Sequence, residues 1–129
     1  MISQTAQYAL RAVVCLAHTS QNSLTTEQLA EMTKVPLMYL AKVMQSLVRA
    51  DIVTSKPGKT GGFALKIPSN ELSLLTVIET IDSPQGIETY PLDMQAYGSV
   101  LRPLYQRLSQ MDALVHKECS SIFIKDLLP

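Results

Sequence analysis

The strongest constraint on the fold is the apolar stripe of residues 40–48, which follows Pro36 and precedes a β-branched run. Pro36 fits the first turn of a helix, where its fixed φ and missing N–H do no harm. The opposite face of this helix carries long polar side chains and few acids, so it is either ordinary solvated surface or a contact for a polyanion. The stripe follows the i, i+3, i+4, i+7, i+8 spacing of a half-buried helix, at Leu40, Val43, Met44, Leu47 and Val48.

A shorter helix is predicted before this one and a hairpin after it. Thr25 followed by Gln28 is a capping box, which predicts a helix of about two to three turns. Residues 52–55 are largely β-branched and predict a strand, and residues 63–67 predict the returning strand. Short helix, turn, longer helix and hairpin are the layout of a winged helix-turn-helix, although a plain surface hairpin is the alternative.

The hairpin turn contains GKT at residues 58–60, which is also the end of a nucleotide-binding P-loop. A P-loop needs a glycine five positions earlier, where this chain has Val53, and it must open a helix rather than a strand. ATP binding is therefore not expected. Lys56 and Lys59 instead suit phosphate contacts from a wing, and the neighbouring glycines are expected to let the backbone turn and approach a duplex.

Two further helices flank this unit. Ser3 is expected to cap a first helix that ends near residues 20–23, and residues 73–81 predict a helix that closes the winged domain. Residues 82–98 contain prolines and glycines, which predict an irregular connection.

The C-terminal segment predicts a long helix that pairs with its copy. Its regular part is expected to begin near Pro103 and to run for about 16 residues. Residues 122–128 are expected to fold back on the body. The apolar seam is longer than one small domain can cover, so it is expected to be the dimerisation element, and it consists of Leu101, Leu104, Leu108, Met111 and Val115.

The sequence thus predicts a mainly α fold with a small β-hairpin. A winged helix-turn-helix domain is expected at residues 1–82, an irregular loop at 83–98, and the dimerisation helix with its tail at 99–129. The formal net charge is zero, but residues 1–66 carry seven basic and three acidic residues, whereas 67–129 carry four and eight. A basic half suits a polyanion-binding face, although chance can divide a short chain in this way.

Taken in order, these pieces resemble the Rrf2 family of winged helix-turn-helix transcriptional regulators, which includes IscR, NsrR and CymR. The resemblance runs through YALRAVVCLA, residues 25–55, the GKTGGFAL hairpin, LSLLTVIETI and IKDLL. It implies a homodimer that binds a palindromic operator in double-stranded DNA. The residues expected at the DNA are Thr26, Leu37, Met38, Tyr39, Lys42, Gln45, Lys56, Lys59, Thr60, Gly61 and Gly62.

Two departures from the family pattern bear on function. Many members hold an iron–sulfur cluster through three cysteines in the loop before the dimerisation helix, whereas residues 81–100 contain none. A cluster needs four thiolate or histidine ligands, and the chain offers only Cys15, Cys119, His18 and His116. No cofactor and no metal site is therefore expected, although an atypical group or small-molecule effector at the dimer interface stays open. In the wing, Pro57 replaces the family's frequent arginine, so bidentate base readout is in doubt there.

The sequence gives less support to other classes of function. No nucleophile, base and orienting group have motif support, so an enzyme is not expected. The amino terminus has no signal-peptide pattern and no segment is apolar enough to cross a bilayer, which predicts a cytoplasmic protein without a membrane partner. The alternative function is a protein-interaction or thiol-sensing module with weak DNA binding.

A thiol sensor would use Cys119, which follows His116 and Lys117 at a polar helix end, and this hypothesis requires Cys119 to be exposed and partly ionised. Cys15, inside an apolar helix, is expected to be protected. The alternative is that Cys119 is a half-buried structural residue.

Overall fold

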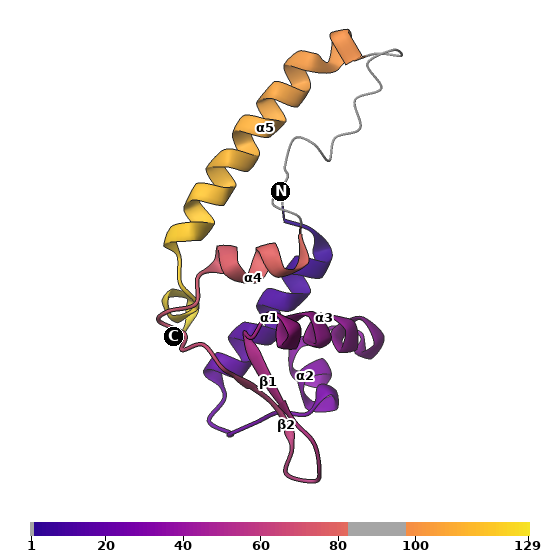
Figure 1. The fold of residues 1–129 in the computed structure, drawn as a ribbon, viewed down its shortest axis with the longest axis vertical. Helices are drawn as coiled ribbons and strands as arrows, with labels where there is room; N and C mark the ends of the chain where they lie inside the picture. Colours follow the sequence, from indigo (N-terminus) through magenta and orange to yellow (C-terminus); the bar gives the residue numbers. More distant parts are fainter. Residues whose placement is uncertain (1, 83–97) are drawn as a thin grey trace.

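The computed structural model describes residues 2–82 and 98–129. Figure 1 shows helices α1 to α4 and a two-stranded hairpin gathered into one body, from which helix α5 extends as a long arm. The fold is therefore mainly helical with one small hairpin, as the sequence predicts. Within the described part of the chain, no helix is both long enough and apolar enough to span a bilayer.

Helix α1 (Gln4–His18) lies at the centre of the body and contacts α2, α3, α4 and the hairpin. It begins at Ser3, whose Oγ accepts a hydrogen bond from the Ala6 amide at 3.0 Å. Three fully buried alanines, Ala6, Ala9 and Ala12, give this helix a smooth face. Small side chains allow the neighbouring helices to approach closely, so one helix can support the rest of the domain.

The helix-turn-helix consists of α2 (Thr26–Thr33) and α3 (Leu37–Arg49). The predicted capping box is present, because the Gln28 amide donates to Thr25 Oγ1 at 3.2 Å and the Thr25 amide donates to Gln28 Oε1 at 2.9 Å. Pro36 is the residue before α3 rather than part of its first turn. The predicted stripe is buried at Leu40, Val43, Met44 and Leu47, and Val48 is half-buried.

The wing is formed by β1 (Val53–Lys56) and β2 (Gly62–Leu65), which pair antiparallel from Val53 opposite Leu65 to Lys56 opposite Gly62. Leu24, just before α2, forms a bridge with Phe63 through two backbone hydrogen bonds of 2.7 and 3.0 Å. Because this bridge joins β2 to the segment that leads into α2, the wing and the helix-turn-helix have a fixed relative position.

The wing glycines have a steric role within the fold itself. Gly61 is buried, and a Cβ at this position would lie 2.0 Å from the Lys56 carbonyl oxygen. Gly62 has a φ of 140°, and its Cβ would lie 2.6 Å from the Leu24 carbonyl oxygen. Both positions therefore exclude a side chain because the wing folds against its own backbone.

Helix α4 (Leu74–Ile81) closes the body, and Ser73 caps it by accepting a hydrogen bond from the Thr76 amide at 3.1 Å. Helix α5 (Gly98–Ser121) follows. The predicted irregular connection lies mostly at residues 83–97, outside the described residues. The expectation that the regular helix begins near Pro103 and has about 16 residues is wrong, because α5 has 24 residues and includes Pro103. Pro103 is in the second turn of α5. Because proline has no N–H, the helix lacks one backbone hydrogen bond there, but it continues on both sides.

The C-terminal tail returns to the body through a short 3₁₀ helix, η2 (Ile124–Leu127). The Ile124 amide donates to the Leu72 carbonyl and the Leu74 amide donates to the Ile122 carbonyl, each at 2.8 Å. Ile124 is fully buried in the main core, as expected, whereas Leu127 is exposed. The tail therefore attaches the C-terminal end of α5, which we call its base, to α4.

Candidate nucleic-acid interface

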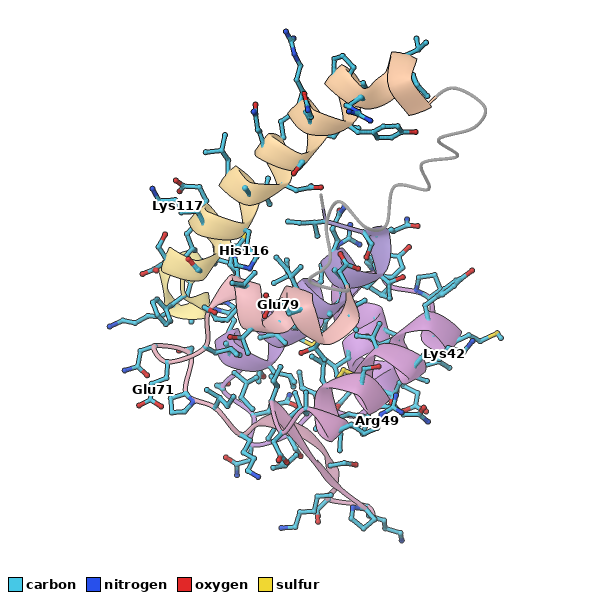
Figure 2. All side chains as sticks on the ribbon, turned by 45° about the horizontal axis from the view of Figure 1, so that its top comes forward. Lys42, Arg49, Glu71, Glu79, His116 and Lys117 are labelled. Carbon is cyan, nitrogen blue, oxygen red and sulfur yellow. The ribbon has the colours of Figure 1, made fainter. Side chains whose placement is uncertain are left out.

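The outer face of α3 is the most accessible polar and apolar surface of the helix-turn-helix. Met38 is 79% exposed, and Leu37 and Tyr39 beside it are also exposed. Lys42, Gln45 and Arg49 continue this face along the helix, and all three are exposed. Figure 2 shows Lys42 and Arg49 on α3, on the side of the molecule away from Glu71 and Lys117. Because the apolar stripe of α3 is buried, Lys42, Gln45 and Arg49 face solvent.

The tip of the wing is a second exposed surface. Lys56, Lys59 and Thr60 are all exposed there, and the turn from Pro57 to Gly61 contains no acidic residue. Ser23 Oγ lies 3.4 Å from the Gly61 carbonyl oxygen and 3.5 Å from that of Thr60, so these contacts tether the turn only weakly to the segment before α2. The wing thus presents two lysines on a turn whose base is held by the Leu24 bridge.

A hollow of about 340 Å³ separates α3 from the wing. Its lining comes from α3, β1 and β2, and consists of Gln45, Val48, Arg49, Ser55 and Phe63. The hollow is open to solvent and few polar groups line it, so it does not resemble an enclosed ligand site. It gives the surface between α3 and the wing a concave centre whose lining includes Gln45 and Arg49.

Four cations on this surface have no acidic partner among the residues that the structure describes: Lys42, Arg49, Lys56 and Lys59. Lys66 differs, because its Nζ lies 3.3 Å from Asp51 Oδ1. An unpaired surface cation can bind a phosphate without first breaking an ion pair, whereas an exposed pair of this kind adds little stability. The electrostatic character of the surface is therefore positive on both α3 and the wing.

An aromatic and cationic cluster beside the first turn of α3 was not predicted from the sequence. The Tyr8 and Tyr39 rings have centroids 6.2 Å apart, and the Arg11 guanidinium lies 5.7 Å from the Tyr8 centroid. The distance of 3.5 Å from Arg11 Nη1 to the Thr33 carbonyl oxygen makes that hydrogen bond weak. Since the cluster joins α1 to α3, no periodicity within either helix indicates it.

The remaining predicted DNA-facing residues are less accessible. Thr26, the first residue of α2, is half-buried, as is Gly62. Gly61 is buried in the single chain, and its assignment to the DNA surface stays a prediction. Arg49 is not among the predicted contacts, although it is exposed seven residues after Lys42 on the same helical face.

Helix α5 carries a second, apolar surface. Leu101, Leu104 and Met111 of the predicted seam are exposed, and so are Val100 and Leu114. Leu108 is half-buried. Val115 also belongs to the predicted seam, but it packs against its own chain in a cluster with Ile78 and Cys119.

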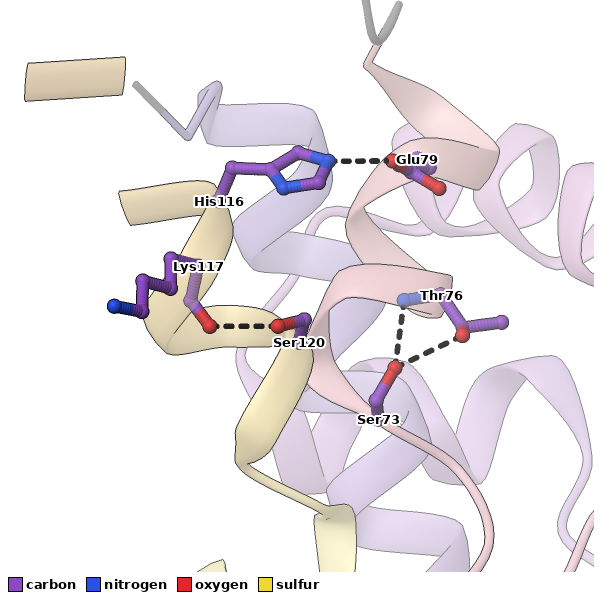
Figure 3. Close-up of polar contacts among 6 residues, drawn as sticks. All are labelled: Ser73, Thr76, Glu79, His116, Lys117 and Ser120. Carbon is purple, nitrogen blue, oxygen red and sulfur yellow. Dashed lines mark hydrogen bonds and ion pairs between the residues drawn. The ribbon is translucent and has the colours of Figure 1, made fainter. Parts of the chain in front are cut away.

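The base of α5 is held against α4 by a polar contact as well. Figure 3 shows the imidazole of His116 directed toward Glu79, with 3.2 Å between Nε2 and Oε1. The Ser120 hydroxyl donates to the Lys117 carbonyl at 2.6 Å within the last turns of α5. The C-terminal end of α5 is therefore attached to the body, whereas its exposed apolar residues lie farther toward its N-terminal end.

The two thiols are arranged in the reverse of the expected order. Cys119 is only 7% exposed and packs with Ala6 and Ile78. Burial raises the pKa of its thiol, and the charge of Glu118 raises it further. The expectation of an exposed, partly ionised Cys119 is wrong because residue 119 lies one turn after Val115, on the helical face that meets α4. Cys15 is half-buried, and burial raises the pKa of its thiol too.

Comparison with known proteins places this geometry in a family. A model of the Rrf2 family, described as iron-dependent transcriptional regulators, matches residues 2–129. The chain belongs to the Rrf2 family.

The similar proteins agree with that membership. A candidate HTH-type transcriptional regulator of Aquifex aeolicus (strain VF5) is 34% identical over 79 residues, which are 61% of this chain and 55% of that protein. IscR of Vibrio cholerae is 32% identical over 77 residues, 59% of this chain and 44% of IscR. The chain thus spans about half the length of these curated relatives. Among solved structures, CymR of B. subtilis superposes with a TM-score of 0.75 at 22% identity, covering 98% of this chain and 95% of CymR, which shows a shared fold.

The family's description mentions iron, and iron needs a set of donor side chains close together. An iron–sulfur cluster is held by four cysteine or histidine ligands. Cys15 is on α1 and packs toward the main core, whereas Cys119 is on α5 in a separate cluster. Nowhere in residues 2–82 and 98–129 do three or more His, Cys, Asp or Glu side chains come together as a metal site. The described residues of one chain therefore do not fit a cluster.

The arrangement of the thiols predicts their order of reaction. An alkylating reagent added to the folded protein should modify Cys15 before Cys119, because access limits the buried thiol more strongly than the half-buried one. Peptide mass spectrometry over a time course measures both rates, and unfolded protein, in which both cysteines are accessible, is the control. Faster modification of Cys119 in the folded state would contradict this arrangement.

Proposed function

We propose that this protein is a transcriptional regulator that binds duplex DNA through α3 and the wing. The observation that carries the proposal is the group of four unpaired cations on two elements that flank one hollow. Phosphate contacts supply most of the affinity of such proteins for DNA and fix their position on the duplex. The Rrf2 family membership supports the same function.

The side chains of α3 suit contacts in the major groove, which admits an α-helix. Gln45 lies midway along the exposed face and can pair with adenine through two hydrogen bonds, whereas Arg49 can pair with guanine or with a phosphate. Met38 and Tyr39 at the start of the helix suit apolar contact with a thymine methyl group or the sugar backbone. In this proposal Lys56 and Lys59 of the wing bind phosphates, and Arg11 supports the first turn of α3.

Dimerisation through α5 is the second part of the proposal. Val100, Leu101, Leu104, Met111 and Leu114 are exposed on an arm that extends from the body. Soluble monomers rarely expose a contiguous apolar surface of this kind, so a second copy of the helix is the natural partner. A two-fold dimer would present two α3 helices to the two halves of a palindromic operator.

The first test of DNA binding is the charge of the wing. Replacing Lys59 with Ala should weaken binding to all duplex sequences alike and should lower the slope of log K against log salt by roughly one unit. Fluorescence anisotropy at several salt concentrations measures both quantities.

Lys117→Ala is the matched control for this change. It removes one exposed lysine from the side of the molecule opposite α3, so the salt slope should stay at the parent value. Equal slopes for the parent and the Lys59 variant would remove the wing from the interface.

The second test concerns the apolar arm. Leu104 is 51% exposed in a single chain, so Leu104→Glu should leave the monomer folded and place two carboxylates in the proposed seam. Burying unpaired charge is strongly unfavourable, so the variant should sediment as a monomer at micromolar concentrations at which the parent is a dimer. Gln110→Glu, which adds the same charge at an exposed polar position, should remain dimeric. A monomeric parent protein would refute the dimer.

One observation favours a second candidate function. Leu37, Met38 and Tyr39 form an exposed apolar start to α3, which a protein partner could cover as readily as DNA. The salt dependence of DNA binding separates the two functions, because counterion release requires affinity for DNA to fall steeply with salt. A flat salt response with weak DNA binding would favour the protein-binding module.

The proposed regulator acts without a resident iron–sulfur cluster. Its two cysteines lie in separate clusters, and residues 83–97 contain neither cysteine nor histidine. Protein purified without oxygen should therefore show no absorption bands between about 320 and 600 nm, where thiolate-ligated clusters absorb. Such bands, lost on exposure to air, would show that a cluster is assembled across two chains.

A further inference from the structure

A half-buried hollow between α1 and the end of α2 holds a pair of sulfur atoms that the DNA interface does not use. Cys15 Sγ and Met32 Sδ are 3.9 Å apart. Both residues line a hollow of about 570 Å³, together with His18, Arg11 and the C-terminal residues 128–129. Most of the residues that line the hollow are apolar, and the hollow is open to solvent.

We infer that this hollow is a binding site for a soft monovalent metal ion, Cu(I), with Cys15 and Met32 as sulfur ligands and His18 as the third ligand. Thiolate and thioether sulfur are the donors that select Cu(I) over harder ions, and imidazole also suits copper. None of the three ligands is among the proposed DNA contacts, so the site can be tested on the protein alone.

The separation of the sulfurs matches one shared ion. Two sulfurs that each lie about 2.3 Å from a metal ion at a trigonal angle are about 4 Å apart. The observed 3.9 Å therefore needs no movement of α1 relative to α2. His18 lies three residues after Cys15 on α1, and helix neighbours at this spacing have Cβ atoms about 5–6 Å apart, within reach of a common ligand.

The other lining residues decide which ions are disfavoured. No Asp or Glu side chain lines the hollow, and Mg²⁺ and Ca²⁺ require such oxygen donors. Zinc sites use thiolate, imidazole and carboxylate rather than thioether, and they need four ligands. Arg11 is the one permanent cation in the lining, but its guanidinium is directed to the Tyr8 ring and the Thr33 carbonyl. A single thiolate also neutralises the charge of a monovalent ion.

Binding exchanges one proton for one ion. The Cys15 thiol loses its proton to solvent, its sulfur forms the bond to Cu(I), and no electron is transferred. Metal binding by a cysteine requires the loss of its thiol proton.

The test is a titration of the reduced protein with Cu(I) under anaerobic conditions, in competition with the coloured chelator bicinchoninate. The parent should take one equivalent per chain from the chelator. Cys15→Ser should take none, and Met32→Leu, which keeps the apolar volume at an exposed position, should bind at least about tenfold more weakly. Circular dichroism checks that both variants are folded.

Cys119→Ser is the matched control, because it removes the other thiol from a cluster that contains neither Met nor His. This variant should retain the parent's affinity for Cu(I). A parent protein that cannot compete with the chelator, or a Cys15→Ser variant that binds as tightly as the parent, would overturn the site. Neither result would affect the test of DNA binding, which uses the wing lysine.

Discussion

The burial of one face of α3 against α1 is the interaction on which the rest of the structure depends. Leu40, Val43, Met44 and Leu47 are at most 1% exposed, and the small alanines of α1 let the two helices approach. Burying four such side chains contributes roughly 6–12 kcal/mol before the entropy of ordering them is subtracted. Because side chains project all around a helix, burying one side of α3 also determines which residues face solvent on the other side. The outward face is the one that carries Lys42, Gln45 and Arg49.

The wing and the arm depend on this core in different ways. The wing is joined to the helix-turn-helix by the Leu24 bridge and by glycines that have no room for a side chain, so its lysines are held at a defined distance from α3. Among the residues that the structure describes, the C-terminal end of the arm contacts the body through the Val115 and Cys119 cluster, the His116 contact and the returning tail. In the proposed dimer, the projecting apolar helix would pair the two copies and place one α3 and one wing at each half-site.

The position of the sulfur pair matters because α2 is the first helix of the helix-turn-helix. Met32 is in the last turn of α2 and Cys15 is near the end of α1, so an ion bound to both would join the central helix to the element that positions α3. A ligand changes an equilibrium only through different affinities for two states. The hollow is where such a difference could arise without involving the DNA-facing residues.

Local rules determined much of this protein. The capping residues Ser3, Thr25 and Ser73, the stripe of α3 and the hairpin were all readable from the sequence, because each depends on neighbours within about four residues. The tertiary structure decided what depends on contacts between distant segments. It turned Cys119 inward against α4, placed Gly61 inside the wing, continued α5 through Pro103, and brought Tyr8 and Arg11 beside Tyr39. The polar neighbours of Cys119 in the chain predicted exposure, but helical geometry places adjacent residues about 100° apart around the axis, so only the packing of α5 on α4 determines which of them is buried.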